Sequence, residues 1–243
     1  MDFDGKVVLV TGSSSGIGEA TARAFSAAGA TVVVNSKSSV ADGERVAAEL
    51  RDATYVQADV ADEADVARLL DTALERHGRL DVLVNNAGTT EVIAHHDLAA
   101  AGIDVWRRIF ETNVFGTWSV TVAAMDALRA TRGAVVNVSS IAGLRPTGSS
   151  IPYAASKAAL NHLTVLLAKV VGPEVRVNAV APGLVDTPWT KDWDEIRALV
   201  SALAPLKRSG KPTDVADVVV ALASAPYVTG QVVAIDGGLT LVS

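Results

Sequence analysis

The sequence predicts an α/β fold in which helices cover both faces of a parallel β-sheet. Seven short runs rich in β-branched residues alternate with longer segments of helical periodicity along the 243 residues. The runs are largely apolar rather than alternating, which is typical of strands covered on both faces. Strand–helix alternation of this kind implies right-handed crossovers between parallel strands. Because no Pro/Gly/Ser-rich linker or internal repeat divides the chain, we expect one doubly wound domain over residues 1–243.

The expected elements follow in chain order. The predicted strands lie at 7–10, 31–35, 53–57, 82–85, 134–138, 175–180 and 232–235. The clearest helical patterns cover 17–28, 63–77, 106–130, 153–171 and 213–223. Two stretches, 89–103 and 184–212, do not fit the alternation. Loops of this length usually form lids or binding loops, with loose surface excursions as the alternative.

Composition limits the class of protein. At 49% apolar residues, a chain of this length can bury a large core without disulfides. The absence of cysteine excludes disulfide frameworks and thiolate metal sites and fits a reducing compartment. A net charge of −6 with scattered basic residues argues against a nucleic-acid-binding protein.

Targeting and metal-binding signals are also missing. The acidic N-terminus does not resemble a signal peptide, and no apolar window is long enough to span a membrane, so we expect a cytoplasmic protein. His77, His95 and His96 lack the spacing and the third ligand of a zinc site. We therefore expect no metal and place these histidines at the surface.

A glycine-rich loop follows the first predicted strand and opens the first predicted helix. Gly12 permits a tight turn, Gly16 lets backbone N–H groups approach a phosphate, and Gly18 lets the helix pack on the strand. A glycine/serine turn elsewhere would be merely a turn. After the first strand of a βαβ series it predicts a dinucleotide loop and a Rossmann-type sandwich. The residues expected along the phosphates are Gly12, Ser14, Ser15, Gly16, Ile17 and Gly18.

The end of the second predicted strand bears on which dinucleotide binds. NAD sites place an acidic residue about 20 residues past the glycines, to bind the ribose 2′-hydroxyl. This chain has Asn35, Ser36 and Lys37 there. With no carboxylate to repel a 2′-phosphate and a lysine available to pair with it, NADP(H) is favoured over NAD(H). A solvated loop lysine is the alternative, because one lysine is a weaker phosphate signal than an arginine fork.

Tyr153 and Lys157 are a candidate acid–base pair, four residues apart on one face of a predicted helix. A phenol with its ordinary pKa near 10 is a poor acid–base catalyst at neutral pH, and a nearby ammonium would lower that pKa. Ser139 and Ser140 end a strand at the edge where open α/β sheets bind ligands. Asn113 lies inside a helical pattern, where by itself it indicates a kink or an exposed polar residue.

Together these features resemble the short-chain dehydrogenase/reductases, in their compact single-domain branch, over essentially the whole chain. The motif residues that carry the resemblance are Thr11, Gly12, Gly16, Ile17, Gly18, Asp59, Val60, Asn85, Asn86, Ala87, Gly88, Asn113, Ser140, Tyr153, Lys157, Asn178, Pro182, Gly183 and Thr187. Residues 184–212 coincide with the substrate lid of that family. Trp189 and Trp193 lie there, four residues apart, either as lid residues or as the buried stripe of a short helix.

The resemblance implies a role for each catalytic residue. Tyr153 would exchange a proton with the substrate oxygen while hydride moves at nicotinamide C4, and Ser140 would hydrogen-bond that oxygen. Lys157 would lower the Tyr153 pKa and hold the nicotinamide ribose, and Asn113 would keep an ordered water beside Lys157. The implied cofactor contacts beyond the glycine loop are Ser36, Lys37, Asp59, Val60, Asn86, Ala87, Gly88, Tyr153, Lys157, Pro182, Gly183, Val185 and Thr187.

The predicted function is that of an NADP(H)-preferring oxidoreductase, a ketoreductase-type enzyme that interconverts a small carbonyl compound and its alcohol. One alternative is a cofactor-sensing protein that keeps the fold without turnover. Another is an epimerase/dehydratase-type relative, against which the short stretch after the last predicted strand argues. The resemblance also implies a homotetramer, or a dimer. Substrate identity and reaction direction are not predicted by the sequence.

Overall fold

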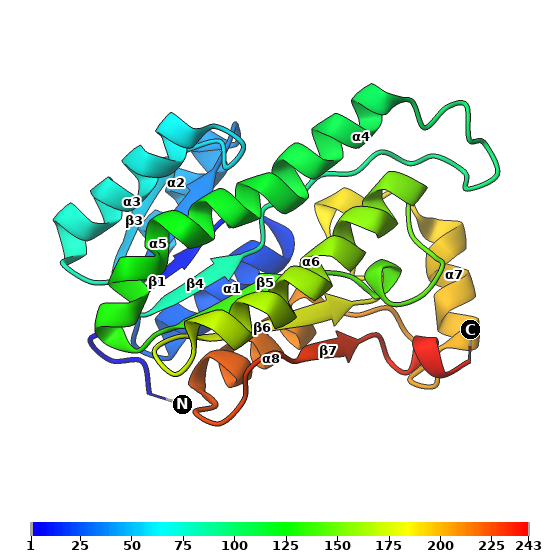
Figure 1. Ribbon diagram of the computed structural model, residues 1–243. Coiled ribbons are helices and arrows are strands. Elements are labelled where there is room, and N and C mark those ends of the chain that lie inside the picture. Colours follow the sequence, from blue (N-terminus) through cyan, green and yellow to red (C-terminus); the bar gives the residue numbers. More distant parts are fainter. Residues whose placement is uncertain (1, 243) are drawn as a thin grey trace.

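The computed structural model describes residues 2–242 and contains a seven-stranded parallel sheet in the order β3-β2-β1-β4-β5-β6-β7 (Figure 1). The strands are β1 (Val7–Val10), β2 (Thr31–Ser36), β3 (Ala53–Gln57), β4 (Val82–Asn85), β5 (Ala134–Val138), β6 (Arg176–Pro182) and β7 (Val232–Ile235). Every neighbouring pair is parallel. The predicted α/β class with a doubly wound, Rossmann-type sheet is confirmed.

Two cores flank the sheet because successive side chains of a strand point to opposite faces. Val7 and Leu9 of β1 pack with residues of α3, α5 and α6, whereas Val8 and Val10 pack with residues of α1, α2 and α8. In Figure 1, α5 and α6 lie in front of the sheet and α1 and α8 behind it. The helices are α1 (Gly16–Ala27), α2 (Val40–Glu49), α3 (Glu63–His77), α4 (Ile103–Phe110), α5 (Thr117–Thr131), α6 (Ile151–Val171), α7 (Asp194–Leu203) and α8 (Pro212–Ser224).

The helices depart from the sequence expectation in two ways. The helix expected over 106–130 begins earlier and is interrupted by a π-helical segment, Glu111–Gly116, between α4 and α5. Such π-turns are frequent at functional sites. The second departure is that α2 and α7 were not among the predicted helices. Each fully buries only one or two residues.

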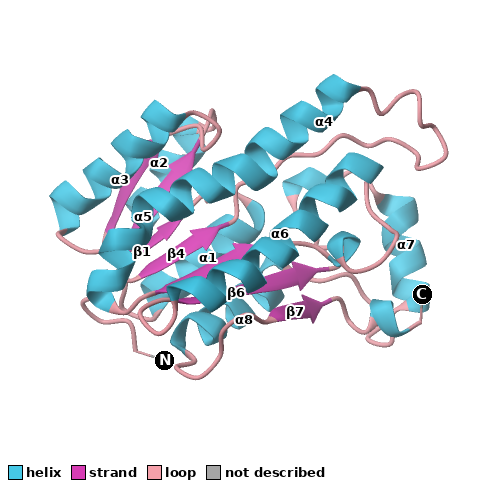
Figure 2. Cartoon of the chain, in the orientation of Figure 1, coloured by secondary structure: helices cyan, strands magenta, loops and turns pink. Residues whose placement is uncertain are grey.

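The strand order places a crevice at the carboxyl ends of the strands. β1 pairs with β2 on one side and with β4 on the other, so consecutive crossovers diverge at this point, where open α/β sheets bind ligands. Figure 2 shows the long loop between β4 and α4 reaching out at this end of the sheet. Within residues 2–242 no helix is long and apolar enough to cross a membrane.

Candidate active site

A cavity of about 630 Å³ lies at the carboxyl ends of the strands. Its walls come from the glycine loop, the ends of β4, β5 and β6, the start of α6 and the segment that follows β6. The predicted site residues that line it are Gly12, Ser15, Gly16, Ile17, Asn86, Ala87, Gly88, Ser140, Tyr153, Lys157, Pro182, Gly183, Val185 and Thr187. Those outside the lining are Ser14, Gly18, Ser36, Lys37, Asp59, Val60 and Asn113.

The glycine loop is held in a tight turn against the end of β4. Gly12 has a φ of +62°, and a Cβ there would lie 2.9 Å from the Ala87 Cα. A Cβ on Gly18 would lie 2.3 Å from the Gly12 carbonyl oxygen. The Asn86 amide donates to the carbonyls of Thr11 and Gly12, at 2.9 and 2.8 Å. The loop therefore requires glycine at positions 12 and 18, as the sequence predicts.

The N-terminus of α1 opens toward this loop. Ser15 precedes the helix and makes no side-chain capping bond. The N–H groups of the first turn therefore keep their capacity to donate to an anion. Gly16, also at positive φ, approaches Thr187 so closely that a Cβ would lie 3.3 Å from its methyl group. These features fit the diphosphate of a dinucleotide, with Thr187 on the far side of the loop.

Lys37 lies at the margin of the site rather than in it. Its side chain is 70% exposed, and its Nζ pairs with the Asp59 carboxylate at 2.6 Å. The Lys37 carbonyl accepts from the Gln57 side chain at 3.0 Å, which fixes the backbone between β2 and β3. Two residues expected near the adenosine end therefore contact each other, and a 2′-phosphate would compete with Asp59 for the ammonium.

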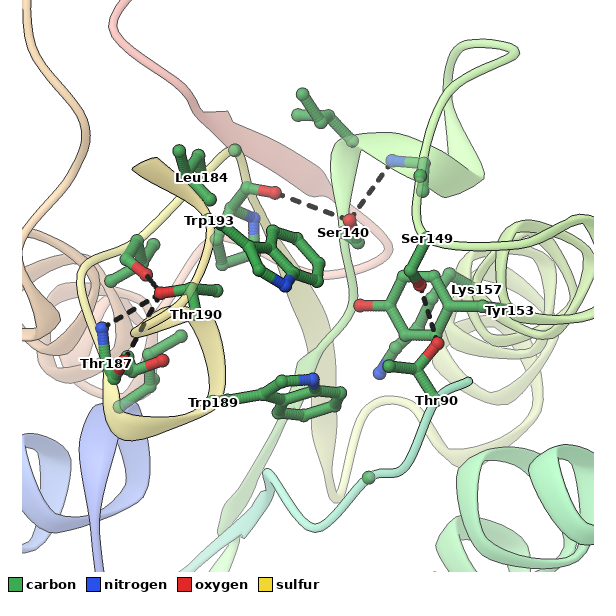
Figure 3. Close-up of a pocket in the computed structure, with 18 of the residues that line it drawn as sticks. Thr90, Ser140, Ser149, Tyr153, Lys157, Leu184, Thr187, Trp189, Thr190 and Trp193 are labelled. Carbon is green, nitrogen blue, oxygen red and sulfur yellow. Dashed lines mark hydrogen bonds between the residues drawn. The ribbon is translucent and has the colours of Figure 1, made fainter. Parts of the chain in front are cut away.

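Tyr153, Ser140 and Lys157 meet in the middle of the cavity (Figure 3). Ser150 caps α6 by accepting from the Tyr153 N–H, which places Tyr153 in the first turn and Lys157 one turn later. Figure 3 shows the Tyr153 hydroxyl pointing into the cavity, with Ser140 nearby. The Ser140 hydroxyl accepts from the Ala142 N–H at 3.1 Å, an anchor that orients it.

Ser139 and Ser140 take different parts in this arrangement. The Ser139 hydroxyl donates to the Lys157 carbonyl at 3.2 Å and so ties β5 to α6. Ser140 instead lies beside the Tyr153 side chain, and its hydroxyl donates to the Pro182 carbonyl at 3.5 Å. The geometry thus places Ser140 beside the phenol, in agreement with the thirteen-residue spacing in the sequence.

Burial dominates the electrostatics of the pair. Burial raises the pKa of Tyr153, and the neighbouring Ser140 hydroxyl offsets this only in part. Burial lowers the pKa of Lys157 to about 8. The Lys157 Nζ donates to the Val138 carbonyl at 2.9 Å and lies 5.7 Å from the centre of the Tyr153 ring. The prediction that Lys157 holds the Tyr153 pKa below its ordinary value is therefore wrong for this structure.

Asn113 is fully buried in the π-helical segment, so the interpretation as an exposed polar residue is wrong. Its side chain accepts from the Thr89 N–H at 2.8 Å and donates to the Thr89 carbonyl and the Ser156 hydroxyl, both at 3.0 Å. A Cβ on Gly88 would lie 3.3 Å from the Asn113 Oδ1 and 3.7 Å from the Lys157 Nζ. Asn113 therefore fixes the loop after β4 beside the lysine.

The segment after β6 covers the cavity with aromatic residues. Trp189 and Trp193 both line it, and the Trp189 ring meets the Tyr153 ring edge-on at 6.4 Å. This excludes the alternative of a buried helical stripe for the two tryptophans. The segment is not a loose excursion either. A parallel bridge joins Val185 to Gly210 at its two ends, and α7 lies between them.

The three histidines considered above for a metal site lie in different environments. His77 forms a hydrogen bond with Thr54 at 3.2 Å, and His96 is exposed. His95 lines the cavity with a buried Nε2, but as a residue it is half-buried, like His77, so it lies only partly at the surface. No periodicity marks a single side chain in a long loop, and the sequence held no signal for it. In the described part of the chain, no group of three or more acidic, histidine or cysteine residues could hold a metal ion.

Known proteins resemble this chain over nearly its whole length. A family model described as enoyl-(acyl carrier protein) reductase matches residues 12–240. The chain is 59% identical over 239 residues to a Streptomyces violaceoruber protein named as a ketoacyl reductase of the granaticin polyketide synthase, covering 97% of this chain and 96% of that one. It is 39% identical over 253 residues to the 3-oxoacyl-[acyl-carrier-protein] reductase of Thermotoga maritima, covering 99% and 100%. A solved short-chain type dehydrogenase/reductase from Mycobacterium marinum superposes with a TM-score of 0.91 at 32% identity, covering 98% and 97%.

Proposed function

The chain belongs to the short-chain dehydrogenase/reductase family, and on that premise we propose that it reduces the carbonyl group of a small molecule with NADP(H). Its relatives carry the names of oxidoreductases that act on keto or hydroxyl groups. The observation that carries the proposal is one continuous cavity running from the glycine loop to Tyr153. Because its walls include residues from 12 to 239, we treat the whole chain as one catalytic domain, with 184–212 as its lid.

The bound nicotinamide would supply the hydride. Tyr153 donates the proton to the substrate oxygen, and Ser140 hydrogen-bonds the same oxygen as its charge develops. Burial raises the pKa of Tyr153, so at neutral pH the phenol carries the proton that it would donate. In this proposal Lys157 holds the nicotinamide ribose, and Asn113 fixes the adjoining backbone.

The preference for NADP(H) rests on the absence of a carboxylate at the end of β2, where Ser36 and Lys37 stand. Paired titrations with NADPH and NADH, followed by tryptophan fluorescence, test it, because Trp189 and Trp193 line the cavity. We expect NADPH to bind at least tenfold more tightly, a difference of about 1.4 kcal/mol. Equal or tighter binding of NADH refutes the preference and leaves NAD(H) as the cofactor.

Turnover is tested by following NADPH consumption with a panel of cyclic and acyclic ketones. Consumption that depends on both ketone and enzyme supports the proposal. Tight NADPH binding without turnover of any ketone or alcohol would instead favour the cofactor-sensing alternative. The presence of Tyr153, Ser140 and Lys157 in one cavity favours an enzyme over such a sensor.

The assembly and the compartment belong to the same proposal. Apolar side chains are exposed on α5 and α6, among them Trp118, Val122, Val165, Leu166 and Val170. An exposed apolar surface of this kind is typical of an interface, so we propose a homotetramer, or a dimer, built on these helices. Light scattering that reports a 25 kDa monomer would contradict it. We also propose that the protein acts in the cytoplasm, in keeping with its lack of cysteine.

A further inference from the structure

The loop between β4 and α4 forms one wall of the cavity and is hydrogen-bonded to the segment that precedes α6. The Ile93 N–H donates to the Ser149 carbonyl at 2.8 Å, and the hydroxyls of Thr90 and Ser149 are 2.6 Å apart (Figure 3). At the start of the loop, Thr89 is bonded twice to Asn113. Although this stretch has no regular structure, its backbone is fixed at several points from residue 89 to residue 93.

His95 lies two residues beyond this fixed stretch and lines the cavity. Its Nε2 is buried and has no hydrogen-bond partner within residues 2–242. The other buried side-chain atoms without a partner in that range belong to Thr21, Asn85 and Asn161, and none of these residues lines the cavity. Leaving a buried polar atom unpaired costs roughly 1–3 kcal/mol, which a hydrogen bond from a ligand would recover.

The surroundings of His95 specify what kind of ligand fits. Among residues 2–242, Lys157 is the one charged side chain in the cavity lining, to which this part of the chain contributes no carboxylate and no guanidinium. Apolar side chains make up most of the wall beyond Tyr153, including Val92, Leu184, Trp189, Trp193 and Ile196. The Thr90 and Ser149 hydroxyls are occupied with each other. An uncharged molecule with a large apolar surface therefore suits this part of the cavity.

Aromatic rings shape the same space. Figure 3 shows the indoles of Trp189 and Trp193 extending from the lid toward the Tyr153 ring. Three ring systems around one cavity favour a flat, cyclic partner, because aromatic faces and edges pack well on such surfaces. A substrate held only by these rings could rotate. A second polar anchor, away from the Tyr153 and Ser140 hydroxyls, would fix which of its carbonyls reacts.

We propose that His95 is a specificity-determining residue, whose Nε2 hydrogen-bonds a second oxygen of an uncharged cyclic or aromatic ketone while the reacting carbonyl lies at Tyr153 and Ser140. The proposal rests on the proposed reductase function and deepens it. It assigns the substrate class as ring ketones that carry an additional hydroxyl or keto oxygen.

The test compares 1-tetralone with its ring-hydroxylated isomers, which add one oxygen to the same fused-ring ketone. We expect the wild type to prefer at least one hydroxylated isomer in kcat/KM by roughly 3- to 10-fold, the range of one hydrogen bond between uncharged groups. His95→Ala removes this preference and leaves kcat/KM for 1-tetralone within about twofold. His95→Asn restores part of it if the amide reaches the oxygen, and His96→Ala, the exposed neighbour, changes neither value.

Two results would overturn the proposal. One is an unchanged preference in His95→Ala. The other is an equal loss for all ketones in that variant, which would indicate that His95 only supports the loop. The melting temperature of each variant with NADPH shows whether it is folded.

A second readout separates this proposal from the reductase function. Binding of each tetralone to the protein loaded with NADP⁺ is followed by tryptophan fluorescence. His95-dependent binding of a hydroxylated isomer without any turnover refutes the reaction and supports the subsite. Turnover of all isomers at the rate of 1-tetralone refutes the subsite and supports the reaction. If no tetralone is bound and none is turned over, the proposed substrate class is refuted.

Discussion

Lys157→Met should remove a rise in the stability of the protein between pH 8 and pH 10.5 that the buried lysine causes. The ammonium is buried in α6, and burial lowers its pKa from the ordinary 10.5 to about 8. Between these two values the unfolded chain holds a proton that the native protein has lost. The stability contributed by this lysine therefore rises with pH across the window and is lowest below pH 8. The full penalty corresponds to roughly 3 kcal/mol, at about 1.4 kcal/mol per pH unit.

The magnitude can be worked out for two accessible conditions. At pH 7 nearly the whole penalty is present, whereas at pH 9.5 about 1.4 kcal/mol of it remains. The stability of Lys157→Met relative to the wild type should therefore fall by about 2 kcal/mol between pH 7 and pH 9.5. The methionine also removes the hydrogen bond from Nζ to the Val138 carbonyl, which shifts both values in the same direction. The change in relative stability between pH 7 and pH 9.5 is therefore a better test than the relative stability at either pH, because the lost hydrogen bond cancels in it.

Urea unfolding of both proteins at several pH values, at one protein concentration and without cofactor, measures this difference. Lys169→Met is the matched control, since Lys169 lies on the same helix but is exposed. The control should follow the wild type at every pH. Parallel curves for Lys157→Met and the wild type, within about 0.5 kcal/mol, would refute the claim that burial controls this lysine.

Three further substitutions test other parts of the site. Gly18→Ala would place a Cβ 2.3 Å from the Gly12 carbonyl oxygen. We therefore expect the affinity for NADPH to fall more than tenfold and the free energy of unfolding to fall by about 1–3 kcal/mol. Unchanged NADPH titration and urea unfolding curves would contradict this. Asn113→Ala leaves partly buried backbone groups of the β4–α4 loop unpaired, and urea unfolding should show a loss of about 1–3 kcal/mol; a loss below 0.5 kcal/mol argues against its anchoring role. Lys37→Ala should weaken NADPH about tenfold and leave NADH binding and stability unchanged; equal effects on both cofactors would show that the pair with Asp59 is merely structural.

The sheet was predictable because each strand is a short β-branched run between clear turn signals. Five of the seven predicted strands have the same bounds in the structure; β2 ends one residue later than predicted, and β6 begins one residue later and ends two residues later. The glycine loop was predictable for a related reason: only glycine tolerates the conformation and the close contacts at Gly12 and Gly18. Both predictions depend on local chemistry that residue types reveal.

The remaining features depend on tertiary contacts that no local pattern reports. The π-helical segment is recognisable only once Asn113 is seen to bond the loop after β4. The raised pKa of Tyr153 and the lowered pKa of Lys157 follow from burial, whereas their spacing alone suggested an ammonium acting on a phenol. His95 gave no signal, because its importance comes from a cavity built by distant segments.

The central claim is that Tyr153 supplies the proton in carbonyl reduction. Tyr153→Phe removes the hydroxyl and keeps the ring that packs against Trp189. General acid catalysis by a positioned group contributes about 10²- to 10⁴-fold. We therefore expect kcat with a reducible ketone to fall at least about 100-fold, with the Kd for NADPH and the melting temperature nearly unchanged. A kcat within tenfold of the wild type, in a variant that binds NADPH normally, would contradict the account.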